Sequence, residues 1–550
     1  MLEKSLIKDI EKSIAGNWDF PAFTDFEGST RTYGKLGKRI LLWHEIFREL
    51  GLKKGDKISL AGRNSSNWAE IFLASLSYGS VAVPILPDFT PENIRHIISH
   101  SDSKVLFVSD NIFKELDIES TRQVETVFSL NDFCLLYTTE DKAGKQVERA
   151  KRAYQEKYQN LGAASFKLPE QSNGDTAAIV YTSGATGFSK GVMLSHNSLT
   201  ANVAFAQEAM PLEPNDKILS FLPAAHSYAC AFEFLFPVSI GCHITFLKKI
   251  PAPPLLLKAF SEVKPRLIFL VPLLIEKIFK SKIKPALEKP LMKAALKTPV
   301  ISKIILGKIR KRLVTLFGGN FIEVIIGGAA LNPEVERFLK KIRFPYAVGY
   351  GMTECGPLIS YYGSAGTKLF SVGKPINYLR LRINSDDPYN KVGEILVKGE
   401  NVMDGYYKNP EMTREAIDED GWLHTGDLGV IDKDGFLYIK GRSKNMILGP
   451  SGQNIYPEEI EATLNTFPFV QESLVIESNG KLVALVFPDF EMADSEGIEV
   501  DGLNKKMNEN LAAINGLLPS YSKLSAIRLY PEEFEKTPTK KIKRYLYDIP

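Results

Sequence analysis

Residues 181–191 read Tyr181-Thr-Ser-Gly-Ala-Thr-Gly-Phe-Ser-Lys-Gly191 and follow the apolar run Ala177-Ala-Ile-Val180. The apolar run predicts a strand, and the glycines, threonines and serines after it predict a loop. Glycines let backbone N–H groups approach an anion closely, hydroxyls add donors or a magnesium ligand, and Lys190 adds positive charge. The segment therefore predicts a strand that leads into a loop holding the phosphates of a nucleotide triphosphate.

The spacing of the glycines indicates which kind of phosphate loop this segment can form. It is Gly-x-x-Gly-x-x-Lys-Gly rather than the Gly-x4-Gly-Lys-Ser/Thr of a Walker loop, so the P-loop NTPase fold is disfavoured, and kinase and GTPase functions with it. A flexible Ser/Gly surface loop is the alternative interpretation of the same residues. The rest of the chain has to decide between the two.

Length and composition limit the class of protein. A chain of 550 residues with 44% hydrophobic and 24% charged residues predicts an ordinary globular protein of at least two domains. Its four cysteines are far apart, which argues against a disulfide framework or structural zinc and favours a reducing cytoplasm. The charged N-terminus predicts no signal peptide, and apolar runs such as 267–275 are too short to span a bilayer. A cytoplasmic protein is expected, soluble or peripheral to the membrane.

The segment 276–312 is strongly basic, with twelve Lys or Arg against two Glu, although the whole chain carries only +3. Its apolar residues recur near helical spacing, which predicts basic amphipathic helices attracted to an anionic membrane at its inner face. Pro285, Pro290 and Pro299 are expected to keep these helices short. Solvated surface helices packed on the domain are the alternative. No aromatic platform accompanies the charge, so nucleic acid is not expected as a partner.

The order of apolar runs predicts an α/β fold. Between 57 and 108, strands and helices alternate, as in a parallel sheet covered by helices. A second α/β pattern has candidate strands at 217–221, 243–247, 267–271, 323–326 and 346–348. The pattern of short strands and turns in residues 379–440 predicts a β-rich subdomain. The composition changes between 440 and 454, which predicts an N-terminal domain over 1–441 and a small α+β domain over 442–550.

Five segments resemble, in order, the motif series of adenylate-forming (AMP-binding) enzymes. They are Tyr181–Val192, Gly349-Tyr-Gly-Met-Thr-Glu354, Gly421-Trp-Leu-His-Thr-Gly-Asp427, Gly441-Arg442 and Lys541-Ile-Lys-Arg544. The resemblance spans almost the whole chain. Within the superfamily, Gly441-Arg-Ser-Lys-Asn-Met-Ile447 and the segment 535–544 are most similar to fatty acyl-CoA synthetases.

The resemblance implies two half-reactions that use ATP, Mg²⁺ and CoA. A carboxylate attacks the α-phosphate of ATP to give acyl-AMP and pyrophosphate, and the thiol of CoA then displaces AMP. Both steps need positioning and cationic stabilisation rather than a protein nucleophile. A Ser-His-Asp hydrolase built on Ser227 and His226 is disfavoured, because no Gly-x-Ser-x-Gly elbow is present.

The resemblance also implies roles for single residues near the phosphates and the base. Pyrophosphate oxygens would contact Ser183, Gly184, Thr186, Gly187 and Lys190. Magnesium would be held by Thr186 and Glu354, directly or through water, and Thr353 would bind the α-phosphate. The adenine slot would comprise Gly328, Ala329, Ala330, Tyr350 and Gly351, with Tyr350 stacked on the base. A plain strand end is the alternative interpretation of 327–330.

Other roles concern the ribose and the acyl group. The resemblance implies that Asp427 accepts the ribose hydroxyls and that Arg442 contacts ribose or phosphate; a Gly-Asp turn and a surface ion pair are the alternatives. His226 would adjoin the acyl and phosphate sites, unless it is a buried structural histidine. The apolar stretch 229–240 could wall an acyl pocket or form a core helix.

In the C-terminal domain, the resemblance assigns Lys541 as the lysine that reaches the carboxylate and the α-phosphate, and Lys444 as the hinge about which this mobile domain swings. A solvated basic tail is the alternative for Lys541. Ala185, Ser189 and Lys540 depart from the commoner Thr, Pro and Gly without removing a required donor. Leu448 stands where some relatives have a second lysine used with CoA.

The sequence thus predicts an ATP-dependent ligase that joins a medium- to long-chain fatty acid to CoA through an acyl-adenylate. Two alternatives remain open: a ligase that loads a free acyl carrier protein, and a catalytically inactive relative peripheral to the membrane.

Overall fold

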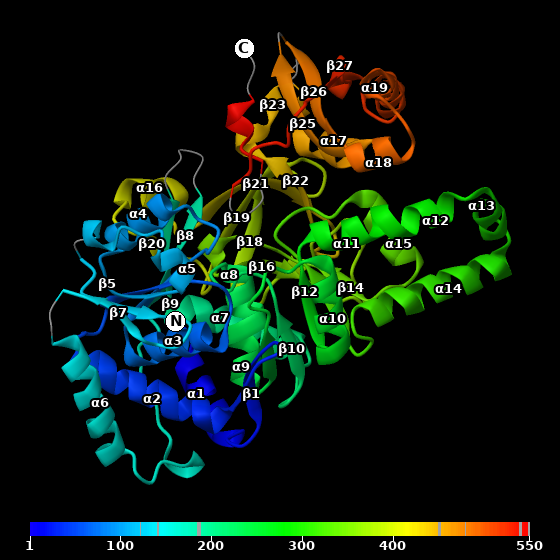
Figure 1. The fold of residues 1–550 in the computed structure, drawn as a ribbon. Helices are drawn as coiled ribbons and strands as arrows, with labels where there is room; N and C mark the ends of the chain where they lie inside the picture. Colours follow the sequence, from blue (N-terminus) through cyan, green and yellow to red (C-terminus); the bar gives the residue numbers. More distant parts are fainter. Residues whose placement is uncertain are drawn as a thin grey trace.

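A computed structural model describes residues 1–121, 123–139, 142–183, 189–448, 453–478, 480–537 and 542–547. Its largest sheet contains the strand that was predicted before the glycine-rich loop, and runs β20-β9-β8-β4-β3-β5-β6-β7 (Figure 1). The strands are β3 (Lys57–Ala61), β4 (Val81–Ile85), β5 (Ser103–Val108), β6 (Thr126–Ser129), β7 (Leu135–Thr138), β8 (Thr176–Ser183), β9 (Ser189–Ser195) and β20 (Gly405–Tyr406).

The middle of this sheet is parallel, as the alternation between 57 and 108 predicts. Helices α2 (Tyr33–Glu49), α3 (Ser66–Tyr78), α4 (Pro91–Ser101) and α6 (Ala143–Lys157) accompany it. β8 and β9 form an antiparallel hairpin in which Thr182 lies opposite Lys190. The chain then enters α7 (His196–Ala209), where the Ser195 hydroxyl caps the helix by accepting the Ser198 N–H at 3.2 Å.

The second α/β pattern is divided between two sheets. β10 (Lys217–Ser220) and β11 (His243–Phe246) share a sheet with β1 (Pro21–Asp25) and β2 (Thr30–Thr32). β12 (Leu267–Leu270), β13 (Glu323–Ile326) and β14 (Tyr346–Val348) form a separate parallel sheet. All five predicted strands therefore exist, and they are divided between two sheets, the first of which also contains β1, paired with β11.

Short helices and hairpins connect these sheets. They include α1 (Leu6–Gly16), α8 (Ser227–Ala229), α9 (Phe236–Ile240), α10 (Pro253–Val263), α11 (Pro272–Ile278), α15 (Pro333–Lys341), α16 (Pro410–Ala416), β15 (Tyr350–Gly351), β16 (Leu358–Tyr361) and β17 (Lys374–Pro375). The β-rich subdomain is the antiparallel sheet of β18 (Leu379–Asn384), β19 (Gly393–Gly399), β21 (Leu423–Ile431) and β22 (Leu437–Arg442).

A smaller C-terminal part lies above the rest in Figure 1. It contains β25 (Val470–Ser478), β26 (Lys481–Pro488), β27 (Ala526–Leu529), α17 (Pro457–Leu464), α18 (Phe490–Ser495) and α19 (Val500–Asn515). Its buried apolar residues form two clusters that share no member with the two clusters of the preceding part. The last buried residue of the first two clusters is Leu437 and the first of the other two is Ile455, and the division between residues 441 and 442 stays a prediction.

Polar contacts join the two parts. Lys284 Nζ donates to the Thr466 carbonyl at 3.0 Å, and the Lys440 ammonium pairs with Glu459 at 3.1 Å. The interface described by these contacts is hydrophilic.

The basic segment forms a helical arm that projects from the molecule (Figure 1). We define the arm as α12 (Lys284–Glu288), α13 (Pro290–Leu296) and α14 (Pro299–Leu316). The expectation that prolines keep these helices short is wrong for α14, which has 18 residues. Pro299 lies in its first turn, where a missing N–H breaks no helical hydrogen bond. None of the described helices combines the length and apolarity needed to cross a membrane.

A buried histidine makes the stability of the large part depend on pH. His44, on α2, is 2% exposed, and its Nε2 lies 2.9 Å from Ser77 Oγ. Burial lowers the pKa of His44 from 6.5 to about 3, because the charged imidazolium would lose its water. Burial likewise lowers the pKa of His196 to about 4. Both side chains therefore stay neutral in the folded protein at pH values where they are charged after unfolding.

We expect the free energy of unfolding to fall as the pH drops below about 6.5, since only the unfolded chain then binds these protons. His44 alone accounts for about 2 kcal/mol between pH 7 and pH 5. Urea titrations of wild type and His44→Gln at both pH values test this, because glutamine keeps an N–H donor but does not titrate. The pH difference should shrink by that amount in the variant, and an unchanged difference would contradict the assignment.

Candidate active site

Tyr350, Asp427 and Arg442 form one hydrogen-bonded group. Tyr350 Oη donates to Asp427 Oδ2 at 2.7 Å, and Arg442 Nε lies 3.0 Å from Asp427 Oδ1. Asp427 is 6% exposed, whereas the Arg442 side chain is 52% exposed. Burial, together with the neighbouring Asp427 carboxylate, raises the pKa of Tyr350, so its phenol stays protonated and donates. The carboxylate of Asp427, the ring of Tyr350 and the guanidinium of Arg442 therefore lie together, and the guanidinium faces solvent.

Strand register explains how these residues meet. Asp427 on β21 is directly opposite Arg442 on β22. Tyr350 opens β15, two residues after the parallel strand β14 ends, and polar groups that follow parallel strands commonly line a ligand site. The alternative interpretation of Asp427 as part of a Gly-Asp turn is wrong, because Asp427 lies within β21. The alternative interpretation of Arg442 is partly right, because Arg442 does form an ion pair, but its partner is the predicted ribose acceptor. That pairing brings two predicted nucleotide contacts together.

Glu354 and Lys190 meet through an aromatic side chain that the sequence analysis missed. Tyr406 Oη donates to Glu354 Oε1 at 2.9 Å, and Lys190 Nζ lies 5.2 Å from the centre of the Tyr406 ring. Tyr406 reaches this position because β20 pairs with β9, with Tyr406 opposite Val192. Lys190 and Glu354 therefore contact the same tyrosine side chain, although they are 164 positions apart in the sequence.

Thr353 and His226 lie at a second contact between distant segments. Thr353 is 8% exposed in the short helix 353–355 and accepts a hydrogen bond from Ser227 Oγ at 3.4 Å. His226 precedes Ser227, and its Nδ1 accepts the Tyr228 N–H at 3.3 Å, which caps α8. This cap gives His226 a structural contact, as in the alternative interpretation, and places it next to the Thr353 segment.

The predicted adenine slot has the small residues that were expected of it. Gly328, Ala329 and Ala330 are exposed just after β13, and Gly328 has a φ of +86°, which favours glycine. A Cβ on Gly351 would lie 2.1 Å from the Pro357 carbonyl oxygen, so only glycine fits this turn. The parallel neighbour of β13 is β14, which leads to Tyr350. The Gly-Ala-Ala turn and Tyr350 therefore follow adjacent strands.

Several predicted residues lie outside the part of the chain that the structure describes. These are Gly184, Thr186, Gly187 and Lys541, together with the side chain of Ser183. Lys444 is described and exposed, in the short helix Ser443–Asn445. Their predicted roles therefore remain predictions that rest on the motifs.

The segment that leads to Lys541 is anchored on both sides. Lys536 forms an antiparallel bridge with Ile542, and its ammonium pairs with Glu472 at 2.8 Å. Arg544 donates to both oxygens of Glu461, each at 2.8 Å, and to the Val475 carbonyl at 2.8 Å. The sequence analysis placed Arg544 in the last of the five motifs and gave it no partner. No spacing signal links it to Glu461, which is 83 positions away.

The stretch 229–240 belongs to the main core. Phe232, Phe234, Leu235 and Phe236 are each at most 1% exposed. Phe232 stacks on Phe269 with ring centres 5.9 Å apart, and Tyr228 packs edge-on against Phe269 at 6.1 Å. The core interpretation is therefore right for most of the stretch, while Tyr228 brings this aromatic group to the Ser227–Thr353 contact.

The ligands that the site offers suit a magnesium ion that arrives bound to a nucleotide better than an ion held by protein side chains alone. The described residues include no group of three or more His, Cys, Asp or Glu side chains arranged to hold a metal. Glu354 offers a partly exposed carboxylate with one oxygen accepting from Tyr406. A hard cation prefers oxygen ligands, and phosphate oxygens can supply the remainder.

Comparisons with known proteins agree with this geometry. The family model described as "AMP-binding enzyme" matches residues 10–407. The peroxisomal long chain acyl-CoA synthetase 7 of Arabidopsis thaliana is 30% identical over 582 aligned positions, which cover 94% of this chain and 80% of that protein. Long-chain-fatty-acid–CoA ligase 5 of Rattus norvegicus is 30% identical, covering 88% of this chain and 78% of its own.

A solved structure gives the same fold. The o-succinylbenzoate CoA synthetase from Bacillus subtilis, in complex with its acyl-adenylate intermediate, matches with a TM-score of 0.75 and 20% identity, over 100% of this chain and 99% of that chain. The family model covers well over half of the chain, and the fold is that of the adenylate-forming enzymes. The chain therefore belongs to the AMP-binding enzyme family.

Proposed function

We propose that this protein is an ATP-dependent fatty acid–CoA ligase that acts through an acyl-adenylate and prefers medium- to long-chain acids. The observation that carries the proposal is the convergence of Lys190, Thr353, Glu354, Tyr350, Asp427 and Arg442, which come from segments up to 252 positions apart. A protein that had kept the fold but lost catalysis would have no need to preserve these contacts.

The chemistry follows from what each group can stabilise. Asp427 accepts hydrogen bonds from the ribose hydroxyls, and Arg442 beside it neutralises ribose-proximal phosphate charge. Lys190 lies with the pyrophosphate oxygens, while Thr353 donates to the α-phosphate. Attack of the carboxylate forms the acyl–phosphate bond and breaks the bond to pyrophosphate, so fixed cations lower the barrier. Magnesium, when bound with ATP near Glu354, supplies further charge neutralisation.

The acyl side of the proposal rests on the aromatic group and on the relatives. Tyr228 follows Ser227, which donates to Thr353, and Phe232 and Phe269 pack against the Tyr228 ring from the buried core. Two relatives at 30% identity carry names that state a long-chain substrate. Apolar surroundings and this similarity both favour an alkyl chain over a small or charged acid.

A carboxylate panel from acetate to palmitate tests the proposal, with pyrophosphate release and acyl-CoA formation measured separately. We expect kcat/KM to rise roughly fourfold for each methylene that becomes buried, which corresponds to about 0.8 kcal/mol, until the pocket is filled. Replacing CoA by a holo-acyl carrier protein tests the alternative acceptor. Equal activity with acetate and palmitate would contradict a fatty acid substrate, and pyrophosphate release without acyl-CoA would contradict CoA as the acceptor.

A further inference from the structure

The outer face of α14 carries a stripe that changes from apolar to basic along the arm. Ile301, Ile304, Lys308, Lys311 and Thr315 follow one another at intervals of three, four, three and four residues, so they lie on one side of the helix. The two isoleucines are at the outer end of the arm, near α13, and the two lysines are nearer its base (Figure 1).

The end of the arm exposes large apolar side chains to an unusual extent. Leu291 is 87% exposed, Val300 69%, Ile304 55% and Ile301 45%. They come from α13 and the first turns of α14, which pack together. Single exposed leucines are common, but four such residues at the end of one projection indicate a surface that is covered in use.

Cations surround these apolar residues. The segment 288–312 contains Lys289, Lys293, Lys297, Lys303, Lys308, Arg310, Lys311 and Arg312, against Glu288 alone. Among the carboxylates of the described residues, none forms an ion pair with any of these eight cations, whereas Lys284 at the foot of the arm pairs with Glu334 at 2.9 Å. The positive charge around the apolar end of the arm is complementary to a lipid bilayer that has an anionic surface and an apolar interior.

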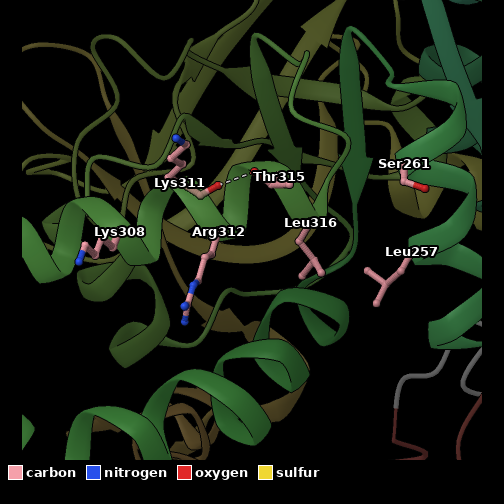
Figure 2. Close-up of a pocket in the computed structure, with 7 residues that line it drawn as sticks. All are labelled: Leu257, Ser261, Lys308, Lys311, Arg312, Thr315 and Leu316. Carbon is pink, nitrogen blue, oxygen red and sulfur yellow. Dashed lines mark hydrogen bonds between the residues drawn. The ribbon is translucent and has the colours of Figure 1, made fainter.

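A hollow at the base of the arm combines the same two properties. It has a volume of about 500 Å³ and lies between α14 and α10 (Figure 2). Lys308, Lys311 and Arg312 line it together with Leu257, Leu316 and two hydroxyl residues, Ser261 and Thr315. None of these residues belongs to the candidate nucleotide site. Its three cations suit anionic groups, whereas the Ser261 and Thr315 hydroxyls already donate to the carbonyls of Lys258 and Lys311.

We propose that the arm docks the protein on the surface of an anionic phospholipid bilayer. The end formed by Leu291, Val300, Ile301 and Ile304 enters the interfacial region, and the cations, including those around the hollow, contact lipid phosphates. This inference goes beyond the ligase activity proposed above, because it concerns where the enzyme works and needs no catalytic residue.

Co-sedimentation with vesicles tests the inference directly. Wild-type protein should sediment with vesicles of mixed phosphatidylglycerol and phosphatidylcholine at least tenfold more than with phosphatidylcholine alone, and high salt should release it. The triple variant Lys308→Glu, Lys311→Glu, Arg312→Glu should lower the partition coefficient at least tenfold. The triple variant Leu291→Ser, Ile301→Ser, Ile304→Ser should weaken binding while leaving its salt dependence in place.

A matched control separates the arm from net charge. Lys114→Glu, Lys145→Glu, Arg152→Glu makes the same change in charge at exposed positions of the large part, away from the arm. This control should bind vesicles to within about twofold of wild type. Circular dichroism shows that each variant is folded, and acyl-AMP formation is measured separately. Failure of the ligase proposal can therefore be told apart from failure of vesicle binding.

Several results would overturn the inference. They are absence of wild-type binding to anionic vesicles, equal binding to neutral vesicles, full binding by either arm variant, and an equal loss in the control. Sedimentation velocity without lipid provides a further check. If wild type self-associates and the serine variant does not, the apolar end pairs two copies of the chain and the bilayer proposal is wrong.

Discussion

Replacing Lys541 with alanine is expected to slow acyl-adenylate formation by roughly 100- to 1000-fold, the range found when one group that stabilises transition-state charge is removed. Attack on the α-phosphate places negative charge on oxygens of both the carboxylate and the phosphate. A lysine ammonium between them stabilises that charge only while the bond forms. The loss should therefore appear in kcat much more than in the KM for ATP.

The structure explains how such a lysine could be held although Lys541 itself lies outside the described residues. Ile542, the residue after it, pairs with Lys536, and Arg544 is fixed by Glu461 and the Val475 carbonyl. The Glu461 and Arg544 side chains are only 12% and 20% exposed, respectively. Arg544 is therefore held in a partly buried ion pair and is not part of a solvated tail.

The measurement should separate the two half-reactions. Single-turnover formation of acyl-AMP should fall in Lys541→Ala, while thioester formation from acyl-AMP supplied in solution should stay within about threefold of wild type, because the lysine is needed only in the first step. Lys543→Ala is the matched control, since Lys543 pairs with Glu535 at the surface. Similar losses in both variants, or in both half-reactions of Lys541→Ala, would refute the assigned role.

Replacing Asp427 with alanine is expected to lower kcat/KM for ATP roughly 100-fold, mainly by raising KM. Two hydrogen bonds from ribose hydroxyls to a carboxylate would be lost, and hydrogen bonds to charged groups contribute about 1.5–3 kcal/mol each. The change also frees Arg442 and leaves the buried Tyr350 hydroxyl without its acceptor. Asp427→Asn should lose less, because the amide oxygen can still accept.

A purely structural Asp427 would give a different result. It would lower the melting temperature but leave the KM for ATP unchanged once the protein is folded. Asp432→Asn is the matched control on the same hairpin: Asp432 pairs with Lys368 at 2.7 Å, away from Tyr350. Isothermal titration with ATP and thermal unfolding of the three variants distinguish the two roles.

Local patterns in the sequence predicted the elements better than the way they assemble. The strand before the glycine-rich segment and the strands 323–326 and 346–348 follow from residue type and spacing over a few positions. The pairing of β1 with β11 does not, because the five residues Pro21–Asp25 give no sign of a partner more than 200 positions away. That pairing adds β1 and β2 to the sheet of β10 and β11.

The sequence likewise predicted some residues of the candidate site and missed others. Motif order brought Asp427, Arg442, Tyr350 and Glu354 into the prediction, and the structure places them within two linked groups. Tyr406 and Glu461 were missed since their roles depend on a two-residue strand and on a contact across 83 positions. Such residues are set by tertiary packing, which short motifs do not encode.

The separate cores on either side of residue 447 have a thermodynamic consequence. Because no buried apolar residue is shared, the C-terminal part can rotate as a body without exposing either core. Such a rotation would break a small set of polar contacts, such as Lys284 with Thr466 and Lys440 with Glu459. Replacing each contact by contacts with water would cost about 1 kcal/mol of free energy. A swing about the predicted hinge at Lys444 would therefore cost no more than the binding of a nucleotide can supply.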